Sequence, residues 1–332
     1  MNLIWLAFQF LVCAALIGWA GFRLSESADR IARALGLTGG WIGLALLATI
    51  TSLPELASGI SAVAVMDAPN LALGNALGAC VFNLLFLVVV DALQRRNPLY
   101  TQASADHLLS AAFGVVMLGL VAMSLLLGER APALLSVGVY SPALLGLYLL
   151  ALRSVHTHEK AHRPDATEAP PQAQDMPAVW QRLGVAALVV LGAGMWLPSL
   201  GDQLASAMGW NRSFVGTLFM ALVTTLPEMA VTLGALRLGA LDMALGNLLG
   251  SNLFNVLILA VDDLFYLRRP LLADASPVHT GTAVAAMVMT GLVMVGLIMR
   301  PRGRVLRLLS WISVGLAATY LLNATLVFVH GS

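Results

Sequence analysis

The feature that most constrains this chain is an internal repeat, in which two linked motifs of the first half return in the second. The stretch TSLPELA at Thr51–Ala57 returns as TTLPEMA at Thr224–Ala230. The stretch LALGNALGACVFNLL at Leu71–Leu85 returns as MALGNLLGSNLFNVL at Met243–Leu257, at almost the same offset in the chain. Two motifs that recur in the same order and at nearly the same spacing predict a fold built from two related halves.

The composition places both halves in a membrane. Of the 332 residues, 59% are hydrophobic and only 11% are charged, whereas soluble domains have about 25% charged residues. Apolar runs of roughly 20 residues, the length that crosses a bilayer, recur along the chain. No basic residue precedes the first run, so we expect it to remain a transmembrane helix rather than be cleaved as a signal peptide. The sequence predicts an all-α polytopic membrane protein with ten transmembrane helices, at 3–22, 38–66, 70–92, 105–127, 131–152, 179–199, 211–236, 240–265, 277–299 and 306–329.

One long polar segment divides the chain. Arg153–Ala178 is rich in Pro, Ala, Gln and charge, and it predicts a flexible linker between halves at 1–152 and 179–332. Lys and Arg are enriched in short cytoplasmic loops, and an outside N-terminus puts 14 of the 18 Lys and Arg residues inside. We therefore expect both termini outside, a cytoplasmic linker, and two five-helix halves of opposite orientation. Such inverted-topology repeats bind substrate near the bilayer midplane, on interrupted helices.

The first motif of each half combines a helix breaker with a buried charge. Pro54 and Pro227 lack an N–H, so the carbonyl four residues earlier loses its helical partner. Glu55 and Glu228 follow directly, and a charged group at the bilayer centre costs about 2.5–3.5 kcal/mol or more. Free carbonyls in hydrocarbon also need protein, water or an ion. Both costs fall on adjacent residues in both halves, so we expect one ligand or partner to satisfy the free carbonyls and the buried carboxylates together.

A hard cation would supply that compensation. Carbonyls, carboxylates and hydroxyls form an all-oxygen set, which suits Ca²⁺, Na⁺ or Mg²⁺ and disfavours zinc or copper. The hydroxyls come from Thr51, Ser52, Thr224 and Thr225. Two carboxylates neutralise one divalent cation, several monovalent cations or protons, and competition among these is what an exchanger requires.

The second motif adds close packing and amide oxygens. Gly74 with Gly78, and Gly246 with Gly250, are four residues apart, a spacing that lets helices approach closely. Asn83 and Asn255 lie one turn beyond Ala79 and Ser251 and face the same way.

These residues resemble the sodium/calcium exchanger family, whose two repeats carry a Thr-Ser-Leu-Pro-Glu element followed by Gly-Asn-x-x-Gly-Ser-Asn-x-x-Asn. The resemblance covers 40–93 and 213–265. It implies a secondary active antiporter that exchanges Na⁺ for Ca²⁺ by alternating access, with the first and sixth helices as a sliding gate. It implies Glu55 and Glu228 as shared Ca²⁺ and Na⁺ ligands. The other implied ligands are Thr51, Thr224, Ser52, Thr225, Ser251, Asn83, Asn255 and the carbonyls of Ala48 and Ala221.

The chain departs from this pattern at two places, which leaves the coupling ion open. The first half has Ala79-Cys80 where the second keeps Ser251-Asn252, and a methyl group cannot bind Na⁺. Asn255 stands where several K⁺-dependent or microbial relatives carry Asp, which argues against K⁺ co-transport. The alternative to Na⁺/Ca²⁺ exchange is a proton-coupled antiporter, or one for another divalent cation such as Mg²⁺ or Mn²⁺, on the same fold.

Other function classes fit less well. An enzyme would need a catalytic constellation, and the sequence has no HExxH and no Asp pair near the midplane. A channel would need a continuous pore, whereas an inverted repeat implies alternating access to one site. We expect no cofactor, no nucleic acid and no protein partner beyond transported cations and lipid. The short loops suggest a bacterial inner membrane.

Several remaining polar residues receive a structural interpretation. We expect Asp91, Asp262 and Asp263 to be interfacial caps or arginine partners, with ion entry as the alternative. The histidines and glutamate of HTHEKAH could bind a regulatory metal but are expected to be solvated linker residues. Cys13 and Cys80 are expected in the core. The residues given no function are His107, His279 and His330, while the linker group comprises His156, His158, Glu159 and His162.

Overall fold

The computed structural model describes residues 3–34, 47–94, 99–162, 176–305 and 309–331, and these are almost entirely helical. The first half contains α1 (Leu3–Ala34), α3 (Ala48–Thr51), α4 (Leu53–Ala64), α5 (Pro69–Leu93), α6 (Leu99–Gln102), α7 (His107–Leu127), η2 (Gly128–Arg130) and α8 (Tyr140–His162). The second contains α9 (Met176–Met208), α10 (Arg212–Phe214), η3 (Val215–Met220), α11 (Ala221–Thr224), α12 (Leu226–Arg237), α13 (Leu241–Phe265), η4 (Leu271–Ala273), α14 (Val278–Met299) and α15 (Trp311–His330).

Seven of these helices are long and apolar enough to cross a membrane, namely α1, α5, α7, α9, α13, α14 and α15. An eighth span is a broken one, in which Arg212–Thr224 and Leu226–Arg237 meet at a bend of 43°. The predicted class, a polytopic helical membrane protein, is therefore confirmed. The count of ten spans stays a prediction, because α4 is a short apolar helix and α8 is less apolar than the seven.

Several helix ends differ from the sequence prediction. The segment expected to begin a helix at 131 instead forms a hairpin of β1 (Ala133–Leu134) and β2 (Val137–Gly138), which pair antiparallel with Ala133 opposite Gly138. Short apolar runs do not distinguish strand from helix, which is why periodicity missed it. Helices α1 and α9 extend well beyond the predicted 3–22 and 179–199, since polar residues outside the bilayer core can continue a helix.

The predicted linker is helical at both ends. Helix α8 continues to His162 and α9 begins at Met176, while 163–175 lie outside the described residues. His156 and His158 therefore lie on a helix, and His158 Nε2 is 3.2 Å from Asp106 Oδ1. The side chains of Glu159 and His162 fall outside the described part, so a metal at this cluster stays untested.

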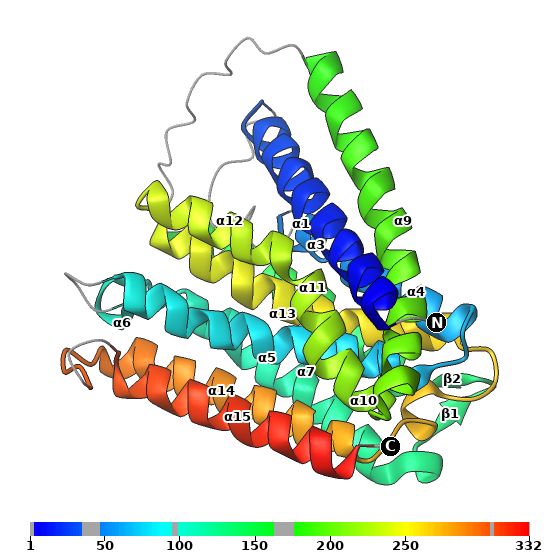
Figure 1. The fold of residues 1–332 in the computed structure, drawn as a ribbon. Coiled ribbons are helices and arrows are strands. Elements are labelled where there is room, and N and C mark those ends of the chain that lie inside the picture. Colours follow the sequence, from blue (N-terminus) through cyan, green and yellow to red (C-terminus); the bar gives the residue numbers. More distant parts are fainter. Residues whose placement is uncertain (1–2, 35–46, 95–98, 163–175, 306–308, 332) are drawn as a thin grey trace.

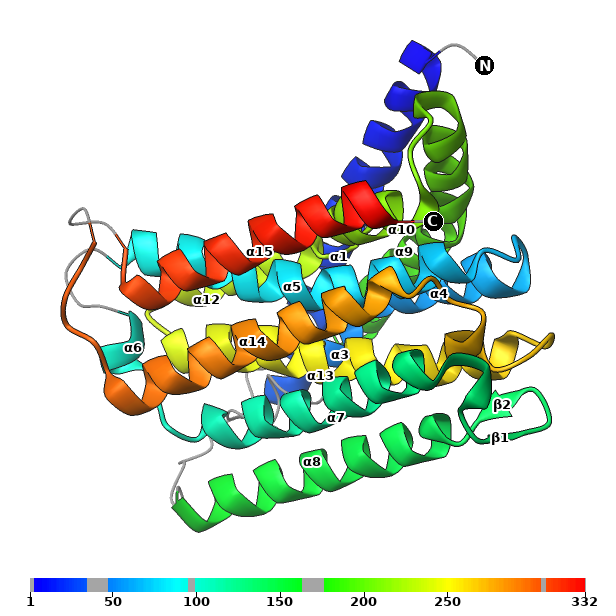
Figure 2. The ribbon, with the colours of Figure 1, turned by 90° about the horizontal axis from the view of Figure 1, so that it is seen from below.

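Helices α5 and α13 form the centre of the bundle and run in opposite directions (Figure 1). Helices α4 and α12 cover them on one side, and α7, α8, α14 and α15 pack on the other (Figure 2). Helices α1 and α9 pack on each other and cross the rest obliquely (Figure 1). Both chain termini lie at the end of the bundle that also carries the β1–β2 hairpin.

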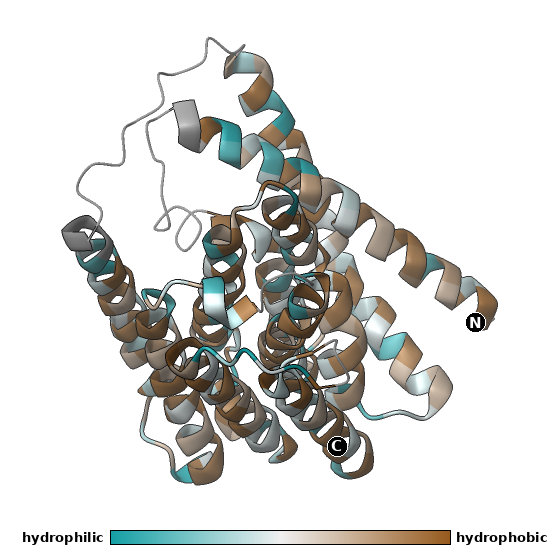
Figure 3. Ribbon diagram, turned by 90° about the vertical axis from the view of Figure 1, so that its left-hand side faces the viewer, coloured by the Kyte–Doolittle hydropathy of each residue, from teal (hydrophilic) through white to brown (hydrophobic). Residues whose placement is uncertain are grey.

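The outer surface of the bundle is apolar. Ile4 is 77% exposed, Leu126 76% and Leu321 64%, each on a helix that faces outward. Figure 3 shows this apolar colouring along the helices, with hydrophilic residues toward the helix ends and loops. Such a large exposed apolar surface suits lipid rather than water.

The two halves have matching elements. Helices α4 and α12 have 12 residues each, and α5 and α13 have 25 each. The helix breaks also match, at Ser52 between α3 and α4 and at Thr225 between α11 and α12.

Each half also caps the last helix of the other half. Asp91, near the end of α5, accepts hydrogen bonds from Ser310 N and Ser313 Oγ at 2.7 Å, where α15 begins. Asp263, its repeat counterpart on α13, accepts from Tyr140 Oη at 2.6 Å and from three further donors. Those donors are Gly138 N at 2.8 Å, Ser141 Oγ at 2.5 Å and Leu271 N at 2.7 Å. The cap prediction is confirmed for both acids, and it is wrong for Asp262, which has no hydrogen-bond partner among the described residues.

Candidate functional site

The two helix breaks form the frame of the site. Ser52 has φ −88° and ψ 13°, and Thr225 has φ −80° and ψ 0°, so neither continues the preceding helix. Pro54 and Pro227 then lie in the first turn of α4 and α12, where a missing N–H costs nothing to the new helix. The second break is preceded by the π-helix η3, a form that is frequent at functional sites.

The breaks place each glutamate at a helix N-terminus inside the protein. Glu55 lies in the first turn of α4 and Glu228 in the first turn of α12, and both are fully buried. The free N–H groups at these N-termini favour negative charge. Ser52, three residues before Glu55, donates its hydroxyl to Glu228, and this bond links the two glutamates in one site.

Hydroxyl groups cross between the halves at this site. Ser52 Oγ donates to Glu228 Oε1 at 2.8 Å. Thr51 Oγ1 is 3.3 Å from Ser251 Oγ, and Thr224 Oγ1 donates to Asn75 Oδ1 at 3.0 Å. Each bond joins a residue of one half to a residue of the other.

The hydrogen bonds of Thr225 and of the two predicted carbonyls stay within one half of the chain. Thr225 Oγ1 donates to Ala221 O at 2.9 Å and Leu222 O at 3.2 Å, within its own helix, so it does not match its counterpart Ser52. Ala221 O also accepts from Thr224 Oγ1, and Ala48 O accepts from Thr51 Oγ1, both at 3.2 Å. The carbonyls of Ala48 and Ala221 therefore each already accept a hydrogen bond from a threonine hydroxyl.

The predicted asparagines are both buried but differ in their partners. Asn83 Nδ2 donates to Asn252 Oδ1 at 3.0 Å, and Asn252 Nδ2 donates to Cys80 O at 3.3 Å. Asn255 is fully buried, and neither its oxygen nor its nitrogen has a partner among the described residues. Ala79, the repeat counterpart of Ser251, is fully buried and has no polar side-chain atom.

Sequence reasoning missed a second pair of asparagines, Asn75 and Asn247, although both stand in the repeated Gly-Asn of the second motif. Asn75 Nδ2 donates to Ser58 Oγ at 2.6 Å while its oxygen accepts from Thr224. Asn247 Nδ2 donates to Glu228 O and Thr232 Oγ1, both at 3.3 Å. The recurrence of Gly-Asn at the repeat offset was the signal that could have identified them.

Close glycine contacts hold the central helices against the breaks. A Cβ on Gly74 would lie 2.9 Å from Thr217 N, and one on Gly78 would lie 2.5 Å from Thr217 O. Only residues without side chains allow α5 to lie this close to η3, which brings Asn75 to Thr224. The predicted packing role of the first glycine pair is confirmed.

The outer helices α1 and α9 cross the breaks at two further glycines. A Cβ on Gly21 of α1 would lie 2.2 Å from Pro227 Cγ, and one on Gly194 of α9 would lie 3.1 Å from Pro54 O. Gly21 and Gly194 are separated by the same offset as the two copies of the first motif, so they are repeat counterparts. Each outer helix therefore rests on the proline of the opposite half.

The site has more buried acceptor atoms than donors. Both oxygens of Glu55, one oxygen each of Glu228, Asn83 and Asn247, and the Asn255 oxygen have no hydrogen-bond donor in the described part of the chain. Buried carboxylate and amide oxygens left in this way are costly, and a hard cation satisfies them. No group of three or more His, Cys, Asp or Glu side chains in the described residues is arranged to hold a metal ion. The oxygens of this site come from carboxylate, amide and hydroxyl groups.

Comparison with known proteins adds an independent line of evidence. The family model described as sodium/calcium exchanger protein matches residues 5–154 and 178–328. The putative antiporter CaxA of Alkalimonas amylolytica is 31% identical over 257 residues, which are 74% of this chain and 76% of CaxA. The inner membrane protein YrbG of Escherichia coli (strain K12) is 25% identical over 248 residues, 73% of this chain and 74% of YrbG.

A solved structure extends the similarity to the fold. The sodium-calcium exchanger NCX_Mj, soaked with 2.5 mM Na⁺ and 10 mM Sr²⁺, aligns with a TM-score of 0.64 over 98% of this chain and 99% of that chain, at 21% identity. The family match covers most of both halves, including both motifs and both helix breaks. The chain belongs to the sodium/calcium exchanger family and is a cation/Ca²⁺ antiporter of the membrane.

Proposed function

We propose that this protein exchanges Na⁺ for Ca²⁺ by alternating access at one site centred on Glu55 and Glu228. The observation that carries the proposal is a pair of fully buried carboxylates, one from each half, with three of their four oxygens unpartnered among the described residues. One Ca²⁺ neutralises both charges and uses the free oxygens. Sodium ions at the same oxygens compete with it, which couples the two fluxes.

In this proposal the other ligands surround the two carboxylates. The hydroxyls of Thr51, Ser52, Thr224 and Ser251, the oxygens of Asn83 and Asn255, and the carbonyls of Ala48 and Ala221 contribute to the Ca²⁺ and Na⁺ positions. Thr225 contributes to a Na⁺ position only. We add Asn75 and Asn247, because Asn75 accepts from Thr224 and Asn247 has a free buried oxygen.

The proposed topology is an inverted repeat of ten helices with halves at 1–152 and 179–332. Equal helix lengths, matching breaks and the opposite directions of α5 and α13 support it. The proposed orientation has both termini outside and the linker in the cytoplasm, and the arginine distribution supports it. The similarity to a protein named an inner membrane protein supports an inner-membrane location.

The proposed gate consists of α1 and α9. Helix α1 packs on α9 and touches the second break through Gly21, while α9 packs on both α1 and α4 and touches the first break through Gly194. Both contacts with the breaks are made at a glycine, which has no side chain. A smooth contact of this kind allows the pair to shift over the prolines, exposing the site to one side of the membrane and then the other. The central helices, which hold the ligands, would remain fixed.

A second candidate is proton coupling with the same divalent substrate. Ala79 favours it, because the first half offers a methyl group where its counterpart Ser251 offers a hydroxyl to Na⁺. Carboxylates that bind Ca²⁺ can bind protons instead, so the exchange cycle needs no Na⁺ ligand at this position.

Transport in proteoliposomes tests both candidates. Vesicles loaded with Na⁺ should take up radioactive Ca²⁺ when Na⁺ is absent outside, and Glu55→Gln and Glu228→Gln should each abolish uptake. Glu129→Gln is the matched control, because Glu129 is 79% exposed and pairs with Arg269 at the surface. Uptake driven only by a pH gradient would support proton coupling, and no Ca²⁺ movement under either gradient would refute the substrate.

A further inference from the structure

Asp262 is a buried carboxylate outside the site described so far. It lies three residues before the end of α13 and is fully buried. Neither of its oxygens accepts a hydrogen bond from any described residue. The adjacent Asp263 accepts four hydrogen bonds and provides the cap at this end of the bundle. Capping therefore does not explain Asp262.

The carboxylate of Asp262 lies against α4 at a glycine. A Cβ on Gly59 would lie 2.4 Å from Asp262 Oδ2 and 2.6 Å from Oδ1, so the acid occupies the space that a side chain at position 59 would fill. Gly59 is one turn beyond Glu55 on the same face of α4. Asp262 is thus displaced from Glu55 by about 6 Å along the axis of α4.

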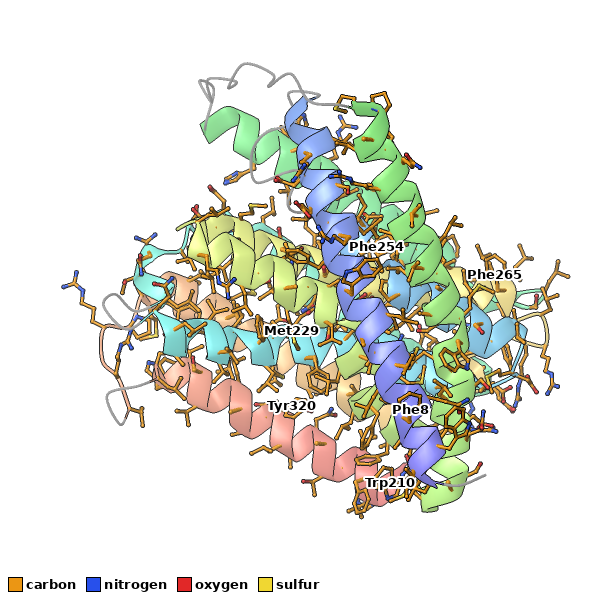
Figure 4. All side chains as sticks on the ribbon, turned by 45° about the horizontal axis from the view of Figure 1, so that its top comes forward. Phe8, Trp210, Met229, Phe254, Phe265 and Tyr320 are labelled. Atoms are coloured by element: carbon orange, nitrogen blue, oxygen red, sulfur yellow. The ribbon has the colours of Figure 1, made fainter. Side chains whose placement is uncertain are left out.

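A row of polar groups on α13 leads from the site to Asp262. Ser251, Asn255 and Asp262 are spaced by four and then seven residues, which places them on one face of the helix. Asn255 has no partner for either side-chain polar atom within the described chain, and Asp262 has none about 10 Å further along the axis. Figure 4 labels Phe254, next to Asn255, and Phe265, three residues beyond Asp262, both on α13.

The acid is specific to the second half. Its repeat counterpart in α5 is Val90, which is fully buried and apolar. The same packing position is therefore filled in the first half without a charge. A buried, unpaired carboxylate is costly in a membrane protein, and such residues mark ion pathways.

We propose that Asp262 is a cation-binding position on the outer access path, between the Glu55–Glu228 site and the end of the bundle that carries the termini. The ligand at Asp262 is a hard cation. Asn255 lies between Asp262 and the central site on the same face of α13, so it is the next polar group that the cation would meet. The proposal rests on the proposed antiport function. Asp263 is the adjacent charged group on its own helix, Glu55 lies one turn before the contacting Gly59 on α4, and no described residue hydrogen-bonds with the Asp262 carboxylate.

The outer rim beyond Asp262 carries an ion pair. Asp67 follows the end of α4 and pairs with Arg268 at 2.6 Å, with 39% of its side chain exposed. Because Asp67 is already paired, Asp262 is the carboxylate near this end of α13 that has no partner among the described residues.

The test compares Asp262→Asn and Asp262→Val with the wild type in right-side-out membrane vesicles and in the reversed orientation. We expect the outside Ca²⁺ concentration for half-maximal transport to rise about tenfold, the loss of one weak ligand. The maximal rate and the half-saturating concentration on the cytoplasmic side should stay within about twofold. Glu129→Gln, in a surface ion pair with Arg269, is the control and should change neither the half-saturating concentrations nor the maximal rate.

The possible outcomes are distinct. A variant with wild-type half-saturation on both sides refutes the inference, and so does an equal change on both sides, which indicates a structural role. If Asp262→Val does not fold, the result for Asp262→Asn, which keeps the shape of the side chain, is decisive. If the wild type itself moves no Ca²⁺ in these vesicles, the proposed function is refuted instead.

Discussion

The two helix breaks have nearly the same backbone and different hydrogen bonds. Ser52 and Thr225 share similar dihedral angles, yet Ser52 donates across the interface to Glu228 whereas Thr225 donates within its own helix. Both oxygens of Glu55 are unpartnered within the described chain, whereas Glu228 has one oxygen bonded. The two repeats thus have helix N-termini of the same backbone geometry, and single side-chain differences give the two glutamates different hydrogen bonds.

The largest effect should come from neutralising either glutamate. Glu55→Gln and Glu228→Gln should each weaken Ca²⁺ binding by about 30-fold or more, since losing a buried charge partner costs about 2–5 kcal/mol. Without cations, Glu55→Gln should raise thermal stability more than Glu228→Gln, because its carboxylate has no donor to lose. Melting curves in detergent with and without Ca²⁺ measure both quantities. Equal changes in melting temperature would contradict the conclusion that Glu55 and Glu228 differ in the hydrogen bonds they accept.

The second largest effect should come from the caps. Asp263→Asn should lower the free energy of unfolding by about 3 kcal/mol, because it weakens four hydrogen bonds to a buried charge. Asp91→Asn should cost less, because Asp91 accepts from two donors. Thermal unfolding of the two variants in the same detergent checks the order. A larger loss in Asp91→Asn would show that donor number does not set the cost.

The two break residues provide a third comparison. Ser52→Ala removes the hydroxyl bonded to Glu228, so we expect the Ca²⁺ affinity to fall about tenfold, or 1.4 kcal/mol. Thr225→Ser keeps a hydroxyl and Thr225→Ala removes one that bonds its own helix, so both should change the affinity about twofold or less. Isothermal titration with Ca²⁺ distinguishes these variants. A tenfold effect of Thr225→Ala would mean that both hydroxyls reach the ion.

The smallest effect should come from restoring symmetry at position 79. Ala79→Ser would place a hydroxyl in the first half where the second has Ser251, adding one oxygen ligand for Na⁺. We expect the Na⁺ concentration for half-maximal exchange to fall about threefold, the size of one neutral hydrogen-bonding group. Exchange at graded Na⁺ concentrations measures it. An unchanged Na⁺ dependence would favour the proton-coupled candidate.

Much of the architecture was predictable because the repeat and the apolar runs are local patterns. They indicated the membrane class, the two breaks and the buried glutamates. The pairing of donors with acceptors was not predictable, since it depends on side-chain packing between helices that belong to different halves of the sequence. Thr232, which accepts from Asn247, was missed for this reason, whereas Asn75 and Asn247 stand in the repeated Gly-Asn, a local pattern that could have identified them. The hairpin at Ala133–Gly138 was missed because its apolar residues have no periodicity that excludes a helix.

The reciprocal caps have a consequence for synthesis of the chain on the ribosome. Tyr140 at the start of α8 bonds to Asp263, which is synthesised 123 residues later. Asp91 likewise has its donor Ser310, at the start of α15, only after the second half has been synthesised. The first half therefore leaves the ribosome with both its last helix and its own acid unpartnered. Neither half can complete its hydrogen bonds until the other has been inserted, so the two halves mature as a single unit.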